Sequence, residues 1–159
     1  MYDGKDSHHF FGTHAVKANE LKNQGYFSRL VDLLAVAPLV GFHYGMRSDR
    51  NNIDDKDATM FMAQIVTVNA RLELNYKTIM LLDKEYEPDE ETRFVKAFQV
   101  KPVDRSAEDL ERYESYTRGG VDFLFDHLIG EGNTQAERLE EMLDLVESFS
   151  DRHYGSQPE

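Results

Sequence analysis

The apolar positions of the chain are densest in residues 26–47. No side chain between residues 33 and 42 is charged or carries an amide, so a helix there would be apolar on every side and would have to be enclosed by other elements. The stretch therefore predicts a buried central helix. Pro38 lies inside it and lacks an amide donor, which predicts a bend near Ala37. The run is too short to cross a bilayer, which takes about 20 apolar residues.

Helical spacing also appears before this central stretch. Residues 13–23 favour a first helix, which Thr13 would cap and Gly25 would end. Residues 1–12 show neither a helical nor a strand period. We therefore expect them to form a flexible N-terminal arm.

Residues 57–83 carry many apolar positions that do not alternate with polar ones, which predicts helix rather than strand. The β-branched run at residues 65–68 would also suit a strand. Asn69 and Asn75 are weak helix formers, and one of them is expected to mark a break between two shorter helices. Pro88 and the acids after it favour the first turn of a further short helix.

Two capping signals mark the later helices. Ser106 and Asp109 resemble a capping box with a shorter acid, and they open a long helix over residues 110–129. Thr134 and Glu137 form a full capping box, and the residues after them give an amphipathic final helix with its acids outward.

Gly119 and Gly120 fall in the middle of the long helix, where they cost about 1–2 kcal/mol compared with alanines. Either close packing against another backbone offsets this cost, or the helix breaks there into two. Residues 130–133 form the next expected turn. The pattern as a whole predicts an all-α fold: a single compact domain of about six or seven helices around a buried central helix, spanning residues 13–152, with residues 153–159 as a tail.

Composition narrows the possible functions. The chain of 159 residues has a formal net charge of −12, which opposes binding to a phosphate backbone. Residues 51–159 carry −13 of that charge and residues 1–50 carry +1. Cysteine is absent, which excludes disulfides and thiolate metal sites, and no signal-like segment opens the chain. We expect a cytoplasmic protein that binds neither nucleic acid nor membrane.

The motifs for common chemistry are missing. No glycine-rich phosphate loop occurs, so nucleotide hydrolysis lacks its usual signature. His8, His9 and His14 lie close together in the sequence, but a metal site needs ligands that converge in a fixed geometry. We expect instead a solvated or docked arm, and we predict no metal site, no cofactor and no catalytic residue.

A glycine-flanked aromatic turn follows the central stretch. Imidazole titrates near neutrality and guanidinium groups bind oxyanions, so this turn could serve acid–base chemistry or phosphate recognition. Aromatic packing with a surface His43 and Arg47 is the alternative. The candidate binding residues are Phe42, His43, Tyr44, Arg47, Arg50 and Arg118.

Residues 37–47, APLVGFHYGMR, and residues 113–124, YESYTRGGVDFL, carry two local patterns. In these patterns the chain resembles small helical proteins encoded with DNA phosphorothioation and related phage-defence gene clusters. The resemblance implies a cytoplasmic accessory protein of a defence system, without an established catalytic site to carry over. The acidic connector at residues 84–91 and the histidines of the arm are not part of the resemblance.

Three functions are therefore open. The first is a non-catalytic accessory or adaptor protein that acts through protein–protein interaction. The second is an acidic mimic of nucleic acid that inhibits a partner protein, and the third is a hydrolase or nuclease with an unrecognised site. The apolar helices carry more apolar residues than one stripe needs, so we also expect a homodimer formed through apolar surface near the Gly119–Gly120 helix.

Overall fold

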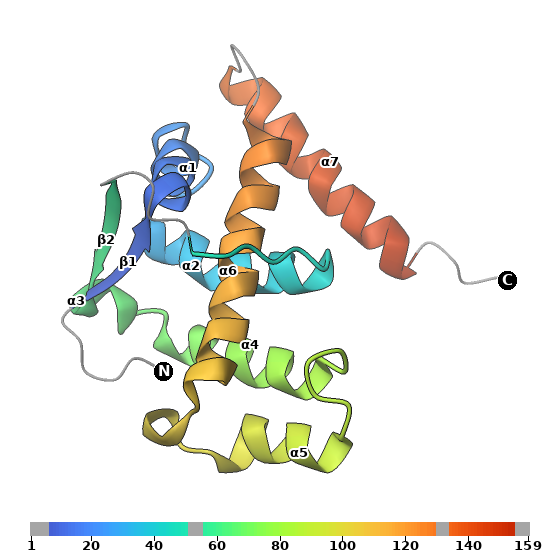
Figure 1. The fold of residues 1–159 in the computed structure, drawn as a ribbon. Coiled ribbons are helices and arrows are strands. Elements are labelled where there is room, and N and C mark those ends of the chain that lie inside the picture. Colours follow the sequence, from blue (N-terminus) through green and yellow to red (C-terminus); the bar gives the residue numbers. More distant parts are fainter. Residues whose placement is uncertain (1–6, 51–55, 130–133, 155–159) are drawn as a thin grey trace, which may run out of the picture.

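Helix α6 (Ala107–Leu128) runs through the middle of the molecule, and the other elements are arranged around it (Figure 1). The computed structural model describes residues 7–50, 56–129 and 134–154. The remaining elements are β1 Ser7–Phe11, α1 Gly12–Asn23, α2 Leu30–His43, β2 Asp57–Phe61, α3 Met62–Ile65, α4 Asn69–Leu82, α5 Glu90–Phe94, a π-helix Val95–Gln99, a 3-10 helix Pro102–Asp104 and α7 Gln135–Tyr154. The predicted helical fold class is confirmed, with one small sheet added to it.

The small sheet corrects two predictions. Strand β1 forms in the segment expected to be an arm, and β2 forms at the start of the segment expected to be one helix. The strands pair antiparallel, with His9 opposite Thr59. Ala58 and Met60 of β2 are buried while their neighbours are more exposed, so a period of two was present but short. The apolar residues that follow it masked the alternation. Residues 1–6 of the expected arm lie outside the described chain.

The expected break near an asparagine lies at Asn69, where α4 begins. Asn75 has a different role. It is buried inside α4, and its Nδ2 donates a hydrogen bond to the carbonyl oxygen of Ala35 in α2 at 2.7 Å. The amide therefore joins two helices at a place where an apolar side chain would leave that carbonyl unpaired. The strand alternative for residues 65–68 is wrong, because these residues lie in α3 and the turn after it.

Helices α2 and α6 cross with their backbones in contact. A Cβ atom added to Gly41 of α2 would lie 2.0 Å from the carbonyl oxygen of Tyr116, and one added to Gly120 of α6 would lie 1.9 Å from that of Ala37. Neither position has room for a side chain. The expected close packing at the glycine pair is confirmed, and α6 continues through it without a break.

The chain that leaves α2 also follows α6. Gly45 ends the helix with φ +65°, and Met46 N donates to the Gly41 carbonyl at 2.8 Å. The Met46 carbonyl then lies where a Cβ of Gly119 would be, at 2.1 Å from it. Ser48 N donates to the Ser115 carbonyl at 3.1 Å. The segment after α2 is thus held along one face of α6.

The apolar core surrounds this crossing. One cluster joins α1, α2, the sheet and the C-terminal half of α6, and a second one joins α4, the π-helix and the N-terminal half of α6. Helix α2 is less enclosed than predicted, because Val36 and Leu39 are 40% and 39% exposed. The side of α2 that carries these two residues is not covered by α6, α4 or α1. No helix of the described residues is long and apolar enough to cross a membrane.

The predicted capping residues occupy the expected positions. The Ser106 side chain accepts a hydrogen bond from Asp109 N at 3.0 Å and begins α6. Thr134 N donates to Glu137 Oε2 at 2.5 Å, and Glu137 N donates to Thr134 Oγ1 at 3.3 Å. This reciprocal pair starts α7, which turns back beside α6 and diverges from it toward its C-terminal end (Figure 1). The turn expected at residues 130–133 lies outside the described residues.

We predict that Gly120→Ala destabilises the protein although alanine is the better helix former. The helix propensity gained is about 1 kcal/mol, but the new Cβ would meet the Ala37 carbonyl, and such overpacking costs about 1–3 kcal/mol or more. Urea unfolding should show a net loss. Gly45→Ala is the control, since its Cβ would meet nothing within 4 Å and only its positive φ is strained. Equal stability of Gly120→Ala and the wild type would contradict the crossing.

Candidate functional site

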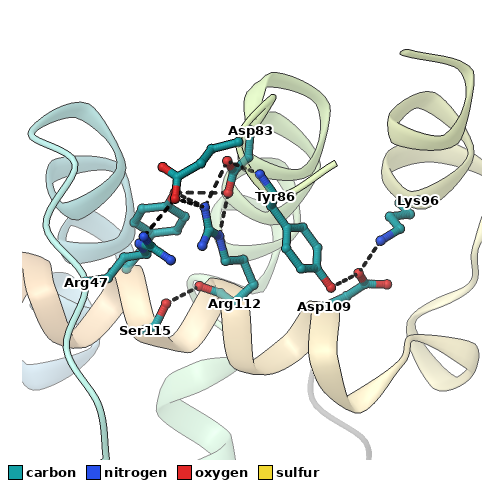
Figure 2. A network of polar contacts seen from close by, with 9 residues as sticks. Arg47, Asp83, Tyr86, Lys96, Asp109, Arg112 and Ser115 are labelled. Carbon is teal, nitrogen blue, oxygen red and sulfur yellow. Dashed lines mark hydrogen bonds and ion pairs between the residues drawn. The ribbon is translucent and has the colours of Figure 1, made fainter. Parts of the chain in front are cut away.

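Asp83, the residue that follows α4, is the most heavily hydrogen-bonded carboxylate in the described chain. It is 3% exposed and lies against α6 (Figure 2). Arg112 donates to it from Nε at 2.7 Å and from Nη2 at 3.1 Å. Tyr116 donates its hydroxyl at 2.9 Å, and the Tyr86 amide donates at 3.1 Å. Four donors, three from α6 and one from the connector after α4, therefore converge on one carboxylate.

A second carboxylate, Asp109, lies on α6 one turn before Arg112 and two turns before Tyr116. Its Oδ1 accepts hydrogen bonds from the Tyr86 hydroxyl at 2.8 Å and from Lys96 Nζ at 2.9 Å. Tyr86 links the two carboxylates, because its backbone amide bonds Asp83 and its hydroxyl bonds Asp109 (Figure 2). Together they join α4, its connector and the π-helix to α6.

Asp122 is the centre of a third group, at the other half of α6. Its carboxylate accepts a hydrogen bond from Ser48 Oγ at 2.5 Å and from Lys17 Nζ at 2.8 Å, and His14 Nε2 lies 3.3 Å from it. His14 is 4% exposed. This group ties α1 and the segment after α2 to α6. Histidine 14 was expected to belong with the arm, and the structure places it in the core of this junction instead.

The protonation of these groups limits their chemistry. Burial alone would raise the pKa of Asp83, Asp109 and Asp122, but the hydrogen bonds and cations around them outweigh it and lower all three. Burial and the Asp83 carboxylate raise the pKa of Tyr116 to about 12. A general acid or base works best with a pKa near the operating pH. The arrangement instead keeps the carboxylates charged and the tyrosine protonated, which suits structural pairing.

The sequence-predicted binding residues do not form one site. Phe42 packs edge-on against Tyr116, with ring centroids 5.3 Å apart, and Tyr44 stacks on Phe123 at 3.9 Å. The ring of His43 lies edge-on to that of Tyr44, with centroids 4.6 Å apart. All three aromatic rings of the turn are thus engaged in ring contacts.

The three arginines of that set are also held apart from one another. Arg47 pairs with the exposed Glu85 at 2.9 Å, and Arg50 lies over the ring of Phe11 at 5.5 Å. Arg118 is buried and donates from Nε to the Ser48 carbonyl at 2.7 Å. Arg118 therefore fixes the segment after α2, and its Nη2 pairs with the exposed Glu111 of the same helix.

Helix α7 carries a row of exposed apolar side chains. Its apolar side chains are 39–63% exposed, and they are Leu139, Met142, Leu143 and Val146. At about 100° per residue these four fall on one side of the helix. We call them the α7 stripe.

The rest of α7 explains why the stripe is left uncovered. Leu145 packs against the core, and Glu141 accepts a hydrogen bond from the Tyr26 hydroxyl at 2.5 Å. These two contacts lie on one side of the helix, next to the α7 stripe and not on it. Glu140, Asp144 and Glu147 border the opposite edge of the stripe, and all three are exposed. The helix therefore presents an apolar band with an acidic margin.

The sequence predicted the amphipathic pattern of α7 but gave no sign that this helix carries an exposed apolar surface. An amphipathic helix normally turns its apolar face to the core, so the pattern alone predicted burial. The capping box and the acids were visible in the sequence. Which face the fold covers depends on where α6 ends and on the angle at which α7 returns.

The described residues also contain no group of three or more histidines, aspartates and glutamates placed to hold a metal ion.

We predict that Asp83→Asn lowers the free energy of unfolding by about 3–5 kcal/mol at pH 7, because Arg112 would keep a buried charge without its partner. The folded-state pKa of Asp83 lies below its unfolded value, so its contribution is full above that unfolded value, near 4, and is lost as the pH falls through the folded value. The gap between variant and wild type should therefore narrow in acid.

Glu85→Gln is the matched control in the same urea unfolding series. Glu85 is 71% exposed and pairs with Arg47 and Arg112 at the surface. Its loss should cost less than about 1 kcal/mol. If Asp83→Asn proved no more harmful than Glu85→Gln at pH 7, the hydrogen bonds of Asp83 would not be what holds α4 to α6.

Comparisons with known proteins add no family to this description. No protein-family model matches the chain, and neither the search of curated proteins nor the search of solved structures gives a match. The features that bear on function are therefore geometric: two buried carboxylates and one part-buried carboxylate that join helices, and one exposed apolar helix face with an acidic margin.

Proposed function

We propose that the protein is a non-catalytic adaptor that binds a partner protein through the α7 stripe. The observation that carries the proposal is the exposure of Leu139 and Leu143. They are 59% and 51% exposed in a helix that begins with a capping box. Contiguous apolar surface bordered by polar residues is typical of a protein interaction site. A helix that offers such a band fits an apolar groove on its partner.

Charge defines the chemistry of the partner. Glu140, Asp144 and Glu147 border the stripe, and the whole chain carries −12. A groove bordered by lysines and arginines would complement this margin, which speeds association and selects among partners. The groups around Asp83 and Asp122 support the same proposal. Their side chains hold helices together, whereas the α7 stripe makes no such contact within the described chain.

The defence setting is part of the proposal and rests on the local resemblance. Three of the four glycines in the two resembling patterns, Gly41, Gly119 and Gly120, lie where α2 and the segment that follows it meet α6. The resemblance therefore supports a shared helix crossing. It does not reach α7, so we propose a partner encoded near this gene in a defence cluster, in the cytoplasm, as a hypothesis separate from the binding surface.

One observation favours mimicry of nucleic acid as a second candidate function. Glu137, Glu140, Asp144 and Glu147 follow one another at intervals of three or four residues along α7. With a rise of about 1.5 Å per residue, these acids repeat about every 4.5–6 Å along the helix axis, a regular row of negative charge like that of a phosphate backbone. A partner that binds nucleic acid in a basic groove would then be the target.

We predict that Leu143→Glu weakens partner binding without unfolding the protein. The tagged full chain and its variants should be used to isolate partners from the cell of origin, and the captured protein should then be purified for titration. Leu143→Glu is expected to raise the dissociation constant of the complex at least tenfold, because a charge would enter the apolar band. Val103→Glu makes the same change at a side chain that is 77% exposed on another surface, and it should leave the affinity unchanged.

Equal weakening by Leu143→Glu and Val103→Glu would contradict the α7 stripe as the binding surface. The same purified pair separates the two candidate functions. If the partner's nucleic acid competes with this protein and if Glu140→Lys with Glu147→Lys weakens binding more than Leu143→Glu does, mimicry is supported. Binding that survives excess nucleic acid and high salt supports an adaptor held by apolar contact.

We also propose that the protein forms a homodimer, although not at the surface first expected. The faces of Gly119 and Gly120 are covered by α2 and by Met46 within one chain, so the glycine pair is not available to a second copy. The α7 stripe is an uncovered apolar surface on which we place the contact of a two-fold pair. Two copies would bring their acidic margins together, which opposes the pairing.

We predict that the dimer strengthens with salt. Screening weakens the repulsion between the two acidic margins and leaves the apolar contact. Sedimentation at micromolar concentration in low and high salt should show a larger dimer fraction in high salt, and Leu143→Glu should give the 18.4 kDa monomer in both. A wild-type monomer under both conditions would rule out this dimer and would leave the binding of a different protein untouched.

A further inference from the structure

Arg105 is buried with most of its hydrogen-bonding capacity unused. It lies between the 3-10 helix and Ser106, the residue that caps α6, and its side chain is 0% exposed. Nη2 donates to Glu73 Oε1 of α4 at 2.5 Å. The Nε and Nη1 atoms are buried and have no hydrogen-bond partner. A guanidinium that gives up water at both of these atoms needs a substitute for it.

Tyr76 lies directly against this guanidinium. Its ring centroid is 3.7 Å from Cζ of Arg105, and the residue is 0% exposed. The cation–π contact offsets part of the cost of burying the charge, but it satisfies none of the N–H groups. The Tyr76 hydroxyl is itself buried without a hydrogen-bond partner. Burial raises its pKa, so the hydroxyl keeps its proton.

The unused groups share one chemical character. Nε and Nη1 of Arg105 are donors only, and the protonated hydroxyl of Tyr76 is a donor as well as an acceptor. What they lack is therefore an acceptor. Two cations lie beside the group as well: Lys77 Nζ lies 3.6 Å from Glu73 Oε1, so Glu73 faces both Lys77 and Arg105.

The group is close to the surface of the molecule. The side chains of Glu73 and Lys77 are 22% and 35% exposed, whereas Arg105 beneath them is fully buried. Tyr113 of α6 lies beside Tyr76, with ring centroids 5.7 Å apart, and it closes the group toward the core.

We propose that Arg105 and Tyr76 form a binding site for a small oxyanion, of the size of phosphate or a short carboxylate, between α4 and the start of α6. A guanidinium binds such groups through a fork of N–H donors. The Tyr76 hydroxyl supplies one further donor. The bound oxyanion would link α4 to the segment that leads into α6, and it would stabilise the folded protein because the unfolded chain does not bind it.

The test uses the full chain and inorganic phosphate, sulfate and acetate as probes, each compared with sodium chloride at equal ionic strength. Wild-type protein should show a saturable rise in melting temperature, and titration calorimetry should give the corresponding dissociation constant. Tyr76→Phe keeps the ring that contacts Arg105 and removes one donor, so it should weaken binding about tenfold. Tyr86→Phe is the control, because that hydroxyl already bonds Asp109, and it should leave the oxyanion affinity unchanged.

Three outcomes would overturn the site. One is the absence of saturable binding by any of the three anions. Another is equal loss of affinity in Tyr76→Phe and Tyr86→Phe, which would point to a general effect on the fold. The third is a Tyr76→Phe protein that is less stable than wild type by the same amount with and without the anions, since the hydroxyl would then be serving a buried water molecule. A preference among phosphate, sulfate and acetate would identify the class of natural ligand.

Discussion

The contact between the backbones of α2 and α6 is the constraint on which the rest of this structure depends. Helices with ordinary side chains at their interface keep their axes about 8–10 Å apart, but Gly41 and Gly120 let carbonyl groups lie where Cβ atoms would be. This approach brings the chain after α2 within reach of α6. Ser48 can then bond the Ser115 carbonyl and the Asp122 carboxylate. Asp122 in turn holds Lys17, so the position of α1 also follows from the crossing.

The buried carboxylates determine how the remaining segments meet α6. Replacing a buried ion pair with apolar residues is often neutral or stabilising, so the groups around Asp83 and Asp109 are better understood as determinants of arrangement than as sources of net stability. Asp83 lies at the end of α4 and takes its donors from α6 and from the connector. A shift of α4 along α6 by one turn would leave Asp83 and Arg112 both buried and unpaired. We infer that these groups select one arrangement among several apolar packings of similar area.

The sequence could predict the parts of the fold that depend on local chemistry. Capping by Ser106 and Thr134 and the helix stop at Gly45 each follow from the residue itself and its neighbours. At Gly120 the sequence left two alternatives, tight packing or a break of the helix, and the structure shows the packing. Strands β1 and β2 could not be predicted in this way, because each is five residues long and is stabilised by a partner about fifty positions away. The candidate surface was missed for a similar reason. Whether Leu143 is buried depends on the direction in which α7 leaves α6, and no local pattern encodes that direction.

Helix α7 differs from the other long helices in how its stability arises. An isolated helix of about this length is marginal in water unless its apolar face is covered, and α7 has a capping box and contacts through Glu141 and Leu145 while its stripe faces solvent. It should therefore be the least stable of the long helices, and the part of the molecule that opens first. Binding at the stripe would add the missing cover. Part of the binding free energy would then be spent on ordering α7, which favours a partner that binds specifically and releases readily over one that binds very tightly. For an adaptor, reversible engagement of this kind is consistent with a core that is held rigidly by the α2–α6 crossing and a single helix that responds to its partner.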